Sequence, residues 1–341
     1  MEEAAKLRGR IFEALERVVK KGIDVWCTPR ETVLDEGTFK LLHYYPTVEN
    51  TLPTPVLIVY AYINRPYVMD LYPGVSVVEK LLETGLNVYM IDWGYPSRAD
   101  RYLSIVDYID FIDVCISKIK KELKVEQVTL HGYCLGGTLS TIYTALDAKK
   151  VRNLILQAAP IDFDTHNTMN IWAKSIDPDK IIDAFGCMPG AFLNTSFLTL
   201  DPVRLIIGKY ESLFEHIEDD YFVRDFLRME RWVFDSPAIP GNVYREYIKE
   251  WYQENKIIKG EYVLNGERVD LRTINVPTLI LAAEKDHIAP PASLEKFFNL
   301  ILSQDKQILS IDRGHIGIST SKKAYKELWP KACEWIKERS G

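Results

Sequence analysis

The chain has 341 residues, of which 47% are hydrophobic and 26% are charged, and its formal net charge is −6. This composition predicts a sizeable buried core, in one large domain with an insertion or in two domains. The acidic balance argues against nucleic acid as the main partner, because phosphate binding favours a basic protein face.

The cysteines, the N-terminus and the apolar runs indicate whether to expect a metal site, an oxidising compartment or a membrane span. The five cysteines show no CxxC or Cys/His spacing, so no metal site is expected. Scattered cysteines in an odd number favour a reducing compartment. The N-terminus is charged rather than signal-like, and no apolar run reaches the roughly 18 residues of a membrane span. We therefore expect a soluble, cytoplasmic protein with no membrane span.

Helices and strands are predicted to alternate through the first half of the chain. Hydrophobic spacing predicts an amphipathic helix over 2–19, packed on the domain surface or, alternatively, docking a partner. Strands are predicted over 38–45, 53–60, 87–91 and 151–157. Helices are predicted over 77–83 and 103–123. Alternation of this kind, with near-continuous apolar strands, implies a mostly parallel central sheet flanked by helices.

The alternation stops near Asp162. From 162 to 271 the chain is rich in aromatic residues and mostly helical in character, which predicts a cap inserted into the sheet domain. The core would then comprise 1–161 and 272–341. Sheet character returns with strands predicted over 276–283 and 306–310, and helices over 292–300 and 324–336.

A short glycine-rich motif lies between a predicted strand and a predicted helix. The apolar stretch 127–131 leads into Gly132-Tyr133-Cys134-Leu135-Gly136-Gly137, and a helix-compatible segment follows over 139–146. This pattern is the nucleophile elbow of the α/β-hydrolase fold, with cysteine in the usual place of serine. Cys134 would lie at a helix N-terminus, where the backbone dipole favours a thiolate. The alternative is a buried cysteine in a turn of another doubly wound fold.

Two later loops could complete a catalytic triad. Members of this fold supply nucleophile, acid and histidine in that chain order. Asp286 follows the strand at 276–283, and His315 follows the strand at 306–310. Both positions lie beyond the carboxyl ends of strands, where catalytic groups gather in such sheets. Asp312 is the alternative acid.

The other histidines are weaker candidates. His131 is expected to pack in the core, whereas His287 adjoins Asp286 and either lines the pocket or does not. The remaining three have no partner at motif spacing: His43, His166 and His216.

An oxyanion hole in this fold uses two backbone N–H groups. One belongs to the residue after the nucleophile, here Leu135. The other comes from the loop after the earlier strand, and we expect it at Ile63, within one residue.

Several motifs in a fixed order resemble the catalytic subunit of polyhydroxyalkanoate synthases. They are 60–67 (Tyr-Ala-Tyr-Ile-Asn-Arg-Pro-Tyr), Asp92-Trp93-Gly94, the elbow, 230–235 (Glu-Arg-Trp-Val-Phe-Asp), 286–288 and Gly314-His315. The similarity runs from about Thr28 to the C-terminus. The short chain is most similar to the class III type, or to the related class IV.

The resemblance implies a specific chemistry and set of partners. It implies 3-hydroxyacyl-CoA substrates, such as 3-hydroxybutyryl-CoA, and a growing polymer held as a cysteine thioester. Cys134, Asp286 and His315 match the family triad, and Tyr62, Asn64 and His287 are the expected substrate contacts. No cofactor is implied, because coenzyme A arrives with the substrate and is released. A second non-catalytic subunit, a homodimer involving the cap and association with polymer granules are also implied.

Two other functions fit the same residues. A cysteine hydrolase of this fold, such as a dienelactone-hydrolase-like enzyme or an acyl-CoA thioesterase, would use the same triad. A catalytically inactive scaffold on granules would not need the triad at all. Cysteine itself favours transfer, because exchange of one thioester for another keeps the acyl group activated for attack by a hydroxyl.

Overall fold

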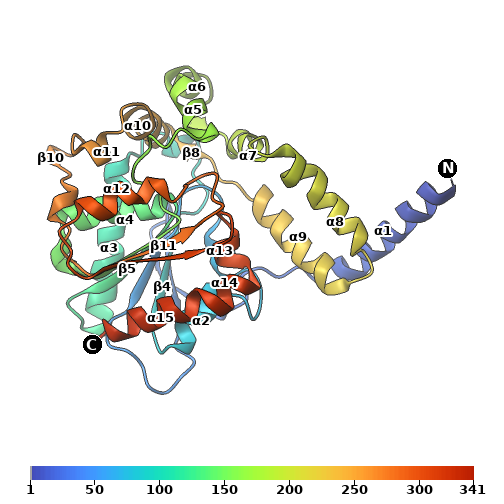
Figure 1. Cartoon of the computed structure of the whole chain (residues 1–341), viewed down its shortest axis with the longest axis horizontal. Coiled ribbons are helices and arrows are strands. Elements are labelled where there is room, and N and C mark those ends of the chain that lie inside the picture. Colours follow the sequence, from blue (N-terminus) through green and yellow to red (C-terminus); the bar gives the residue numbers. More distant parts are fainter. Residues whose placement is uncertain (1) are drawn as a thin grey trace.

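The computed structural model describes the backbone of residues 2–341 and the side chains of residues 12–341. An eight-stranded sheet lies at its centre, in the order β1-β2-β4-β3-β5-β6-β11-β12 (Figure 1). The strands are β1 (Glu31–Asp35), β2 (Lys40–Tyr44), β3 (Val56–Val59), β4 (Val88–Asp92), β5 (Val128–Tyr133), β6 (Val151–Gln157), β11 (Thr278–Ala283) and β12 (Lys306–Ile311). From β4 to β12 all neighbours pair in parallel, whereas β2 runs antiparallel to both β1 and β4. The expected mostly parallel α/β sheet is confirmed.

The near-continuous apolar segments of the sequence form the central strands, because helices cover both faces of the sheet and bury these residues. Every residue of β3, β4, β5 and β11 is buried. The flanking helices are α2 (Val77–Glu83), α3 (Ile105–Leu123), α4 (Leu135–Leu146), α12 (Ala292–Leu300), α13 (Gly317–Thr320), α14 (Lys322–Glu327) and α15 (Trp329–Glu338). Helices α3 and α4 pack together on one face, and α2 and α15 pack together on the other (Figure 1).

Two elements differ from the sequence prediction. The strand β1 was not predicted; it lies at the sheet edge, pairs with β2 alone and has no fully buried residue. The single helix predicted over 324–336 is instead α14 and α15, divided near Leu328. Pro330 lies in the first turn of α15, and proline cannot continue a helix because it lacks a backbone N–H and its ring clashes with the preceding turn.

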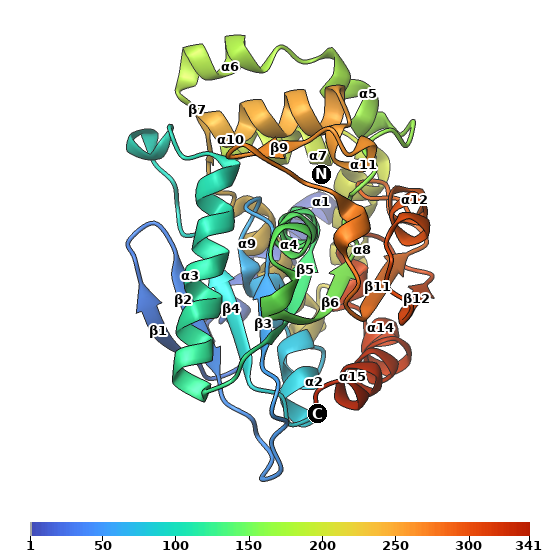
Figure 2. The same ribbon diagram turned by 90° about the vertical axis from the view of Figure 1, so that its left-hand side faces the viewer.

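The segment 162–271 is mostly helical, as expected, and lies above one end of the sheet (Figure 2). Its helices are α5 (Thr168–Ser175), α6 (Pro178–Phe185), α7 (Gly190–Leu198), α8 (Lys209–Glu215), α9 (Asp220–Phe234), α10 (Gly241–Glu246) and α11 (Lys256–Lys259). Two π-helical segments also occur, at Val203–Gly208 and Tyr247–Gln253. Short strand pairs join β7 (Cys187–Met188) to β8 (Ile239–Pro240), and β9 (Val263–Leu264) to β10 (Glu267–Arg268). The division of the chain into core and cap remains a prediction.

The N-terminal helix α1 (Glu2–Lys20) joins α8 and α9 in an arm that extends away from the sheet (Figure 1). A small apolar cluster holds the arm together, and it is separate from the main core. Its buried members are Ala14, Val18, Leu213, Ile217 and Val223. Arg17 and Lys21 also pair with Asp220, at 2.6 and 2.8 Å. The predicted amphipathic helix over 2–19 would also place Leu7 and Ile11 on its apolar face, but both lie outside the described side chains.

Candidate active site

Cys134 occupies a strained turn between β5 and α4. Its φ and ψ angles are 54° and −129°, a conformation that L-residues rarely adopt. Two backbone hydrogen bonds hold this turn: Cys134 N–H donates to Gln157 O at 3.0 Å, and Gly137 N–H donates to Cys134 O at 2.8 Å. Strain of this kind persists only where the surrounding structure enforces it. The turn therefore presents the Cys134 side chain at the carboxyl end of the central strand.

Two glycines let the backbone segments approach closely enough to form this turn. A Cβ atom at Gly136 would overlap the Val59 carbonyl oxygen in β3. A Cβ atom at Gly132 would lie against the Gly137 backbone at the start of α4. Strand, turn and helix fit together only where these side chains are absent.

The loops after β11 and β12 bring Asp286 and His315 together. His315 Nδ1 lies 2.7 Å from Asp286 Oδ2. The other carboxylate oxygen, Oδ1, accepts hydrogen bonds from the N–H groups of Ile288 and Ala289, both at 2.8 Å. These bonds fix the carboxylate, and they leave His315 Nε2 as the ring nitrogen available to Cys134.

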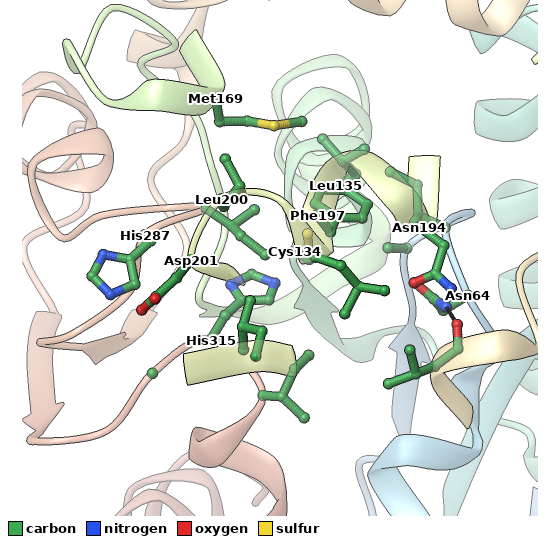
Figure 3. A pocket seen from close by; sticks show the side chains of 18 of the residues that line it. Asn64, Cys134, Leu135, Met169, Asn194, Phe197, Leu200, Asp201, His287 and His315 are labelled. Carbon is green, nitrogen blue, oxygen red and sulfur yellow. Dashed lines mark hydrogen bonds between the residues drawn. The ribbon is translucent and has the colours of Figure 1, made fainter. Parts of the chain in front are cut away.

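Cys134 and His315 face the same cavity from neighbouring positions (Figure 3). Each is 9% exposed, and Asp286 is 5% exposed. Burial lowers the pKa of His315, but the charges of Asp286 and Cys134 and the hydrogen bonds to both raise it well above its ordinary value. An imidazole with a raised pKa is a stronger acceptor for the thiol proton, and the thiolate formed by that transfer is the nucleophilic form of cysteine.

Tyr133 contacts His315 through both its hydroxyl group and its ring, and the sequence did not predict this contact. Its hydroxyl donates to the His315 carbonyl oxygen at 2.9 Å. Its ring stacks on the imidazole, with centroids 5.3 Å apart and planes inclined by 24°. The sequence does not predict this contact, because the elbow motif Gly-x-Cys-x-Gly does not specify the residue at Tyr133, and Tyr133 lies 182 residues before His315.

The alternative acid and the elbow histidine have other partners. Asp312 pairs with Lys285 at 2.7 Å, and that ion pair lies largely in solvent. His131 is fully buried, and its Nε2 lies 2.9 Å from Gln157 Oε1. Burial lowers the pKa of His131 to about 4, so this histidine is neutral and packs in the core beneath the elbow.

The two expected oxyanion donors border the same cavity as Cys134. Leu135 and Ile63 both line it. Among the described residues, neither backbone N–H donates to a protein acceptor. Both groups are thus available to bind a negatively charged oxygen, which is the requirement for an oxyanion hole.

The three expected substrate contacts occupy different places. Asn64 and His287 line the cavity. Tyr62 is instead buried in aromatic packing, with ring centroids 5.4 Å from Tyr108 and 6.3 Å from Tyr247. Tyr62 therefore lies behind the cavity wall rather than on its surface.

The cavity has a volume of about 350 Å³ and is mostly apolar. Its floor carries the elbow and His315, while side chains from 162–271 form its walls and roof (Figure 3). The apolar residues among the latter are Met169, Phe197, Leu198, Leu200, Leu205, Trp232, Val233, Tyr247 and Tyr252. The polar residues are Asn194, Asp201 and Arg204. A concave, apolar site with few polar groups suits a small organic acyl group.

Within the described residues, no group of three or more His, Cys, Asp or Glu side chains could hold a metal ion. Nor does any described helix combine the length and apolar character needed to cross a bilayer.

Comparison with protein families gives two matches. Residues 54–321 match the model of the alpha/beta hydrolase fold. Residues 4–81 match the model of the poly-beta-hydroxybutyrate polymerase (PhaC) N-terminus.

Three curated proteins similar to this chain carry the name poly(3-hydroxyalkanoate) polymerase subunit PhaC. The protein from Synechocystis sp. is 42% identical over 96% of this chain and 89% of its own length. The protein from Allochromatium vinosum is 41% identical over 97% of this chain and 94% of its own. That from Haloferax mediterranei is 41% identical over 99% of this chain and 70% of its own.

Solved structures share the fold at low sequence identity. A putative lipase from Sulfolobus solfataricus has a TM-score of 0.57 and 16% identity, and the match covers 91% of this chain and 99% of the lipase. A monoacylglycerol lipase from Paleococcus ferrophilus has a TM-score of 0.55 and 16% identity, covering 88% and 99%. At this identity the likeness establishes the α/β-hydrolase fold alone.

Proposed function

Because the chain belongs to the poly(3-hydroxyalkanoate) polymerase family, we propose that it builds a polyester through an acyl group carried on Cys134. The enzyme is an acyltransferase. It joins 3-hydroxyacyl units supplied as coenzyme A thioesters, with 3-hydroxybutyryl-CoA as the expected substrate, and releases coenzyme A. The observation that carries the cysteine step is the hydrogen-bonded pair of His315 and Asp286 beside the strained turn at Cys134.

The first step transfers the acyl group from coenzyme A to the enzyme. The Cys134 thiol gives its proton to His315 Nε2, and the thiolate attacks the thioester carbonyl carbon. The N–H groups of Leu135 and Ile63 stabilise the negative oxygen that develops. The carbon–sulfur bond to coenzyme A then breaks, and the departing thiolate takes the proton from His315. One thioester replaces another, so the acyl group remains activated.

The second step forms the ester of the polymer. A hydroxyl group, from the next 3-hydroxyacyl unit or from the growing chain, attacks the carbonyl carbon of the Cys134 thioester. His315 is the base within reach of Cys134, and Asp286 is the alternative base. An oxyester forms and the Cys134 thiol is restored. Conversion of a thioester to an oxyester is downhill, which gives the cycle its direction.

Transfer requires that water be kept away from the acyl-enzyme, since attack by water would give a free acid. The apolar walls from 162–271 support this part of the proposal. We propose that this segment is the cap of the enzyme and acts as its lid.

Partners and location follow from the same proposal. A second, non-catalytic subunit as in the class III type is supported by the word subunit in the names of the relatives. We also propose a homodimer, and association with polymer granules in the cytoplasm. Large apolar side chains exposed on the arm support a role in association, among them Phe12, Val203, Ile207 and Tyr221.

One assay separates polymerisation from hydrolysis. The protein is incubated with 3-hydroxybutyryl-CoA, with and without the second subunit, while released coenzyme A and insoluble polyester are both measured. We expect coenzyme A release in step with polyester, and neither product from Cys134→Ala. Release accompanied only by free 3-hydroxybutyrate would instead establish a cysteine hydrolase.

A further inference from the structure

Hydrogen bonds join the loop that carries Ile63 to the C-terminal end of α9. Asn64 follows Ile63 directly, and its side-chain amide Nδ2 lies 2.7 Å from Ser236 Oγ. The same nitrogen lies 3.3 Å from Val233 O and 3.4 Å from Trp232 O. Ser236 in turn directs its own hydroxyl hydrogen to Val233 O at 3.1 Å, so its lone pairs face the amide. The Asn64 side chain is thus a donor to a cap helix.

Neighbouring residues fix the rest of this loop. Trp232 Nε1 donates to Arg65 O at 2.8 Å, and Trp93 Nε1 donates to Tyr60 O at 2.8 Å. The Arg65 guanidinium pairs with Asp92 at 2.6 Å. Hydrogen bonds and an ion pair therefore hold both ends of the loop in place, and the hydrogen bonds of Asn64 are the ones next to Ile63.

The backbone of Asn64 is left-handed, with φ of 58°. Asparagine tolerates this conformation better than most residues do, and glycine tolerates it without cost. Backbone conformation alone would therefore explain an asparagine here. The three contacts of its amide, two with the last turn of α9 and one with Ser236 just beyond it, suggest a second role, which a glycine could not fulfil.

We propose that Asn64 is a positioning residue for acyl transfer, which holds the Ile63 N–H in place for the oxyanion by bonding the loop to α9. This inference rests on the proposed function, and it replaces the expectation that Asn64 contacts substrate. Asn64 acts through Ile63, because its own amide hydrogens are directed to α9.

Helix α9 also contacts the N-terminal part of the chain. At its other end, α9 holds α1 through the ion pairs of Asp220 with Arg17 and Lys21. Arg228, within α9, also donates to Asp24 O at 2.9 Å. Helix α9 thus contacts α1 near its first turn and the loop that carries Ile63 near its last turn.

The test compares acylation of Cys134 with alkylation of Cys134. Acylation by 3-hydroxybutyryl-CoA needs the oxyanion hole, whereas alkylation by iodoacetamide needs only the thiolate. Asn64→Gly keeps the left-handed backbone and removes the amide. We expect it to slow acylation by about 10- to 100-fold, somewhat less than deletion of an oxyanion donor. KM and the alkylation rate should change less than about twofold, because ground-state binding and the thiolate are untouched.

Two further variants distinguish a local effect on acylation from a general folding defect. Asn64→Asp keeps the size and the left-handed preference but cannot donate to the two carbonyl oxygens, so it should also slow acylation. Ser236→Ala removes the shortest contact from the side of α9. The double variant of Asn64→Gly with Ser236→Ala should be no slower than Asn64→Gly alone, since both remove one interaction. Thermal unfolding of each variant shows whether it is folded.

Several results would overturn the inference. Acylation of Asn64→Gly at the wild-type rate would show that only the backbone conformation matters. Equal slowing of acylation and alkylation would place the effect at the nucleophile instead. Additive losses in the double variant would show that Asn64 does not act through Ser236. If wild-type Cys134 is not acylated at all, the proposed function fails, and the inference fails with it.

Discussion

The substitution Asp286→Asn is expected to reverse the hydrogen-bonding direction of His315. In the wild type, Asp286 Oδ1 accepts two backbone N–H groups at 2.8 Å, and Oδ2 accepts from His315 Nδ1 at 2.7 Å. The variant side chain has a single amide oxygen, which must stay on the two N–H groups, so its NH₂ faces His315. Nδ1 then becomes an acceptor, and the ring proton moves to Nε2, which can no longer take the proton of Cys134.

The cost of this wrong tautomer can be bounded. In serine proteases the corresponding change lowers kcat by about 10⁴-fold. A thiol is more acidic than a hydroxyl and depends less on its base, so we expect a loss of about 10²- to 10³-fold here. That loss equals about 3–4 kcal/mol of transition-state stabilisation at 25 °C.

The assay measures coenzyme A release and the alkylation of Cys134 as functions of pH. The charge of Asp286 raises the pKa of His315, so its loss lowers that pKa and makes the imidazole a weaker acceptor for the proton of Cys134. Alkylation of the variant should therefore slow at neutral pH and recover as the pH rises. A variant with more than half of the wild-type activity and an unchanged alkylation profile would refute this account of the triad.

Three further predictions test neighbouring parts of the site. Cys134→Ser should bind substrate yet lose most turnover, and an unimpaired serine variant in the release assay would contradict the thioester argument. Tyr133→Phe keeps the ring on His315 and removes the hydroxyl bond, so it should lower the free energy of unfolding by about 1 kcal/mol and slow acylation several-fold; wild-type values in denaturant titration and acylation kinetics would show that the bond is dispensable. The pKa of His131 is about 4 in the folded state, below its unfolded value of about 6.5. Between these two pH values the unfolded chain binds a proton that the folded chain does not. The free energy of unfolding therefore falls as the pH drops through this range, by up to about 3 kcal/mol. His131→Gln keeps a donor for Gln157 and should lose this part of the pH dependence in denaturant titrations at pH 4–7; the same slope in both proteins would show that His131 does not cause it.

The local chemistry of the elbow could be predicted from the sequence because its cause is local. Gly132 and Gly136 are needed where backbones meet, and the motif places Cys134 between strand and helix. The loops of Asp286 and His315 could be found because each follows a predicted strand.

Features that depend on distant contacts could not be predicted. Tyr133 acquires its role only when His315 folds back onto it. The packing of α1 on α8 and α9 depends on which faces of α8 and α9 other side chains leave uncovered, and hydrophobic periodicity does not reveal this. The edge strand β1 carries too little apolar signal to be recognised without its partner β2. The break between α14 and α15 was predictable in principle, because Pro330 lies inside the helical pattern.

In the proposed mechanism, polymer synthesis passes through a thioester on Cys134. The most direct measurement is mass spectrometry of the protein quenched in acid within the first turnover of 3-hydroxybutyryl-CoA. We expect a 3-hydroxybutyryl group on the peptide that contains Cys134, absent from Cys134→Ala. Continued polyester synthesis by that variant, or an acyl group found only on another residue, would contradict it.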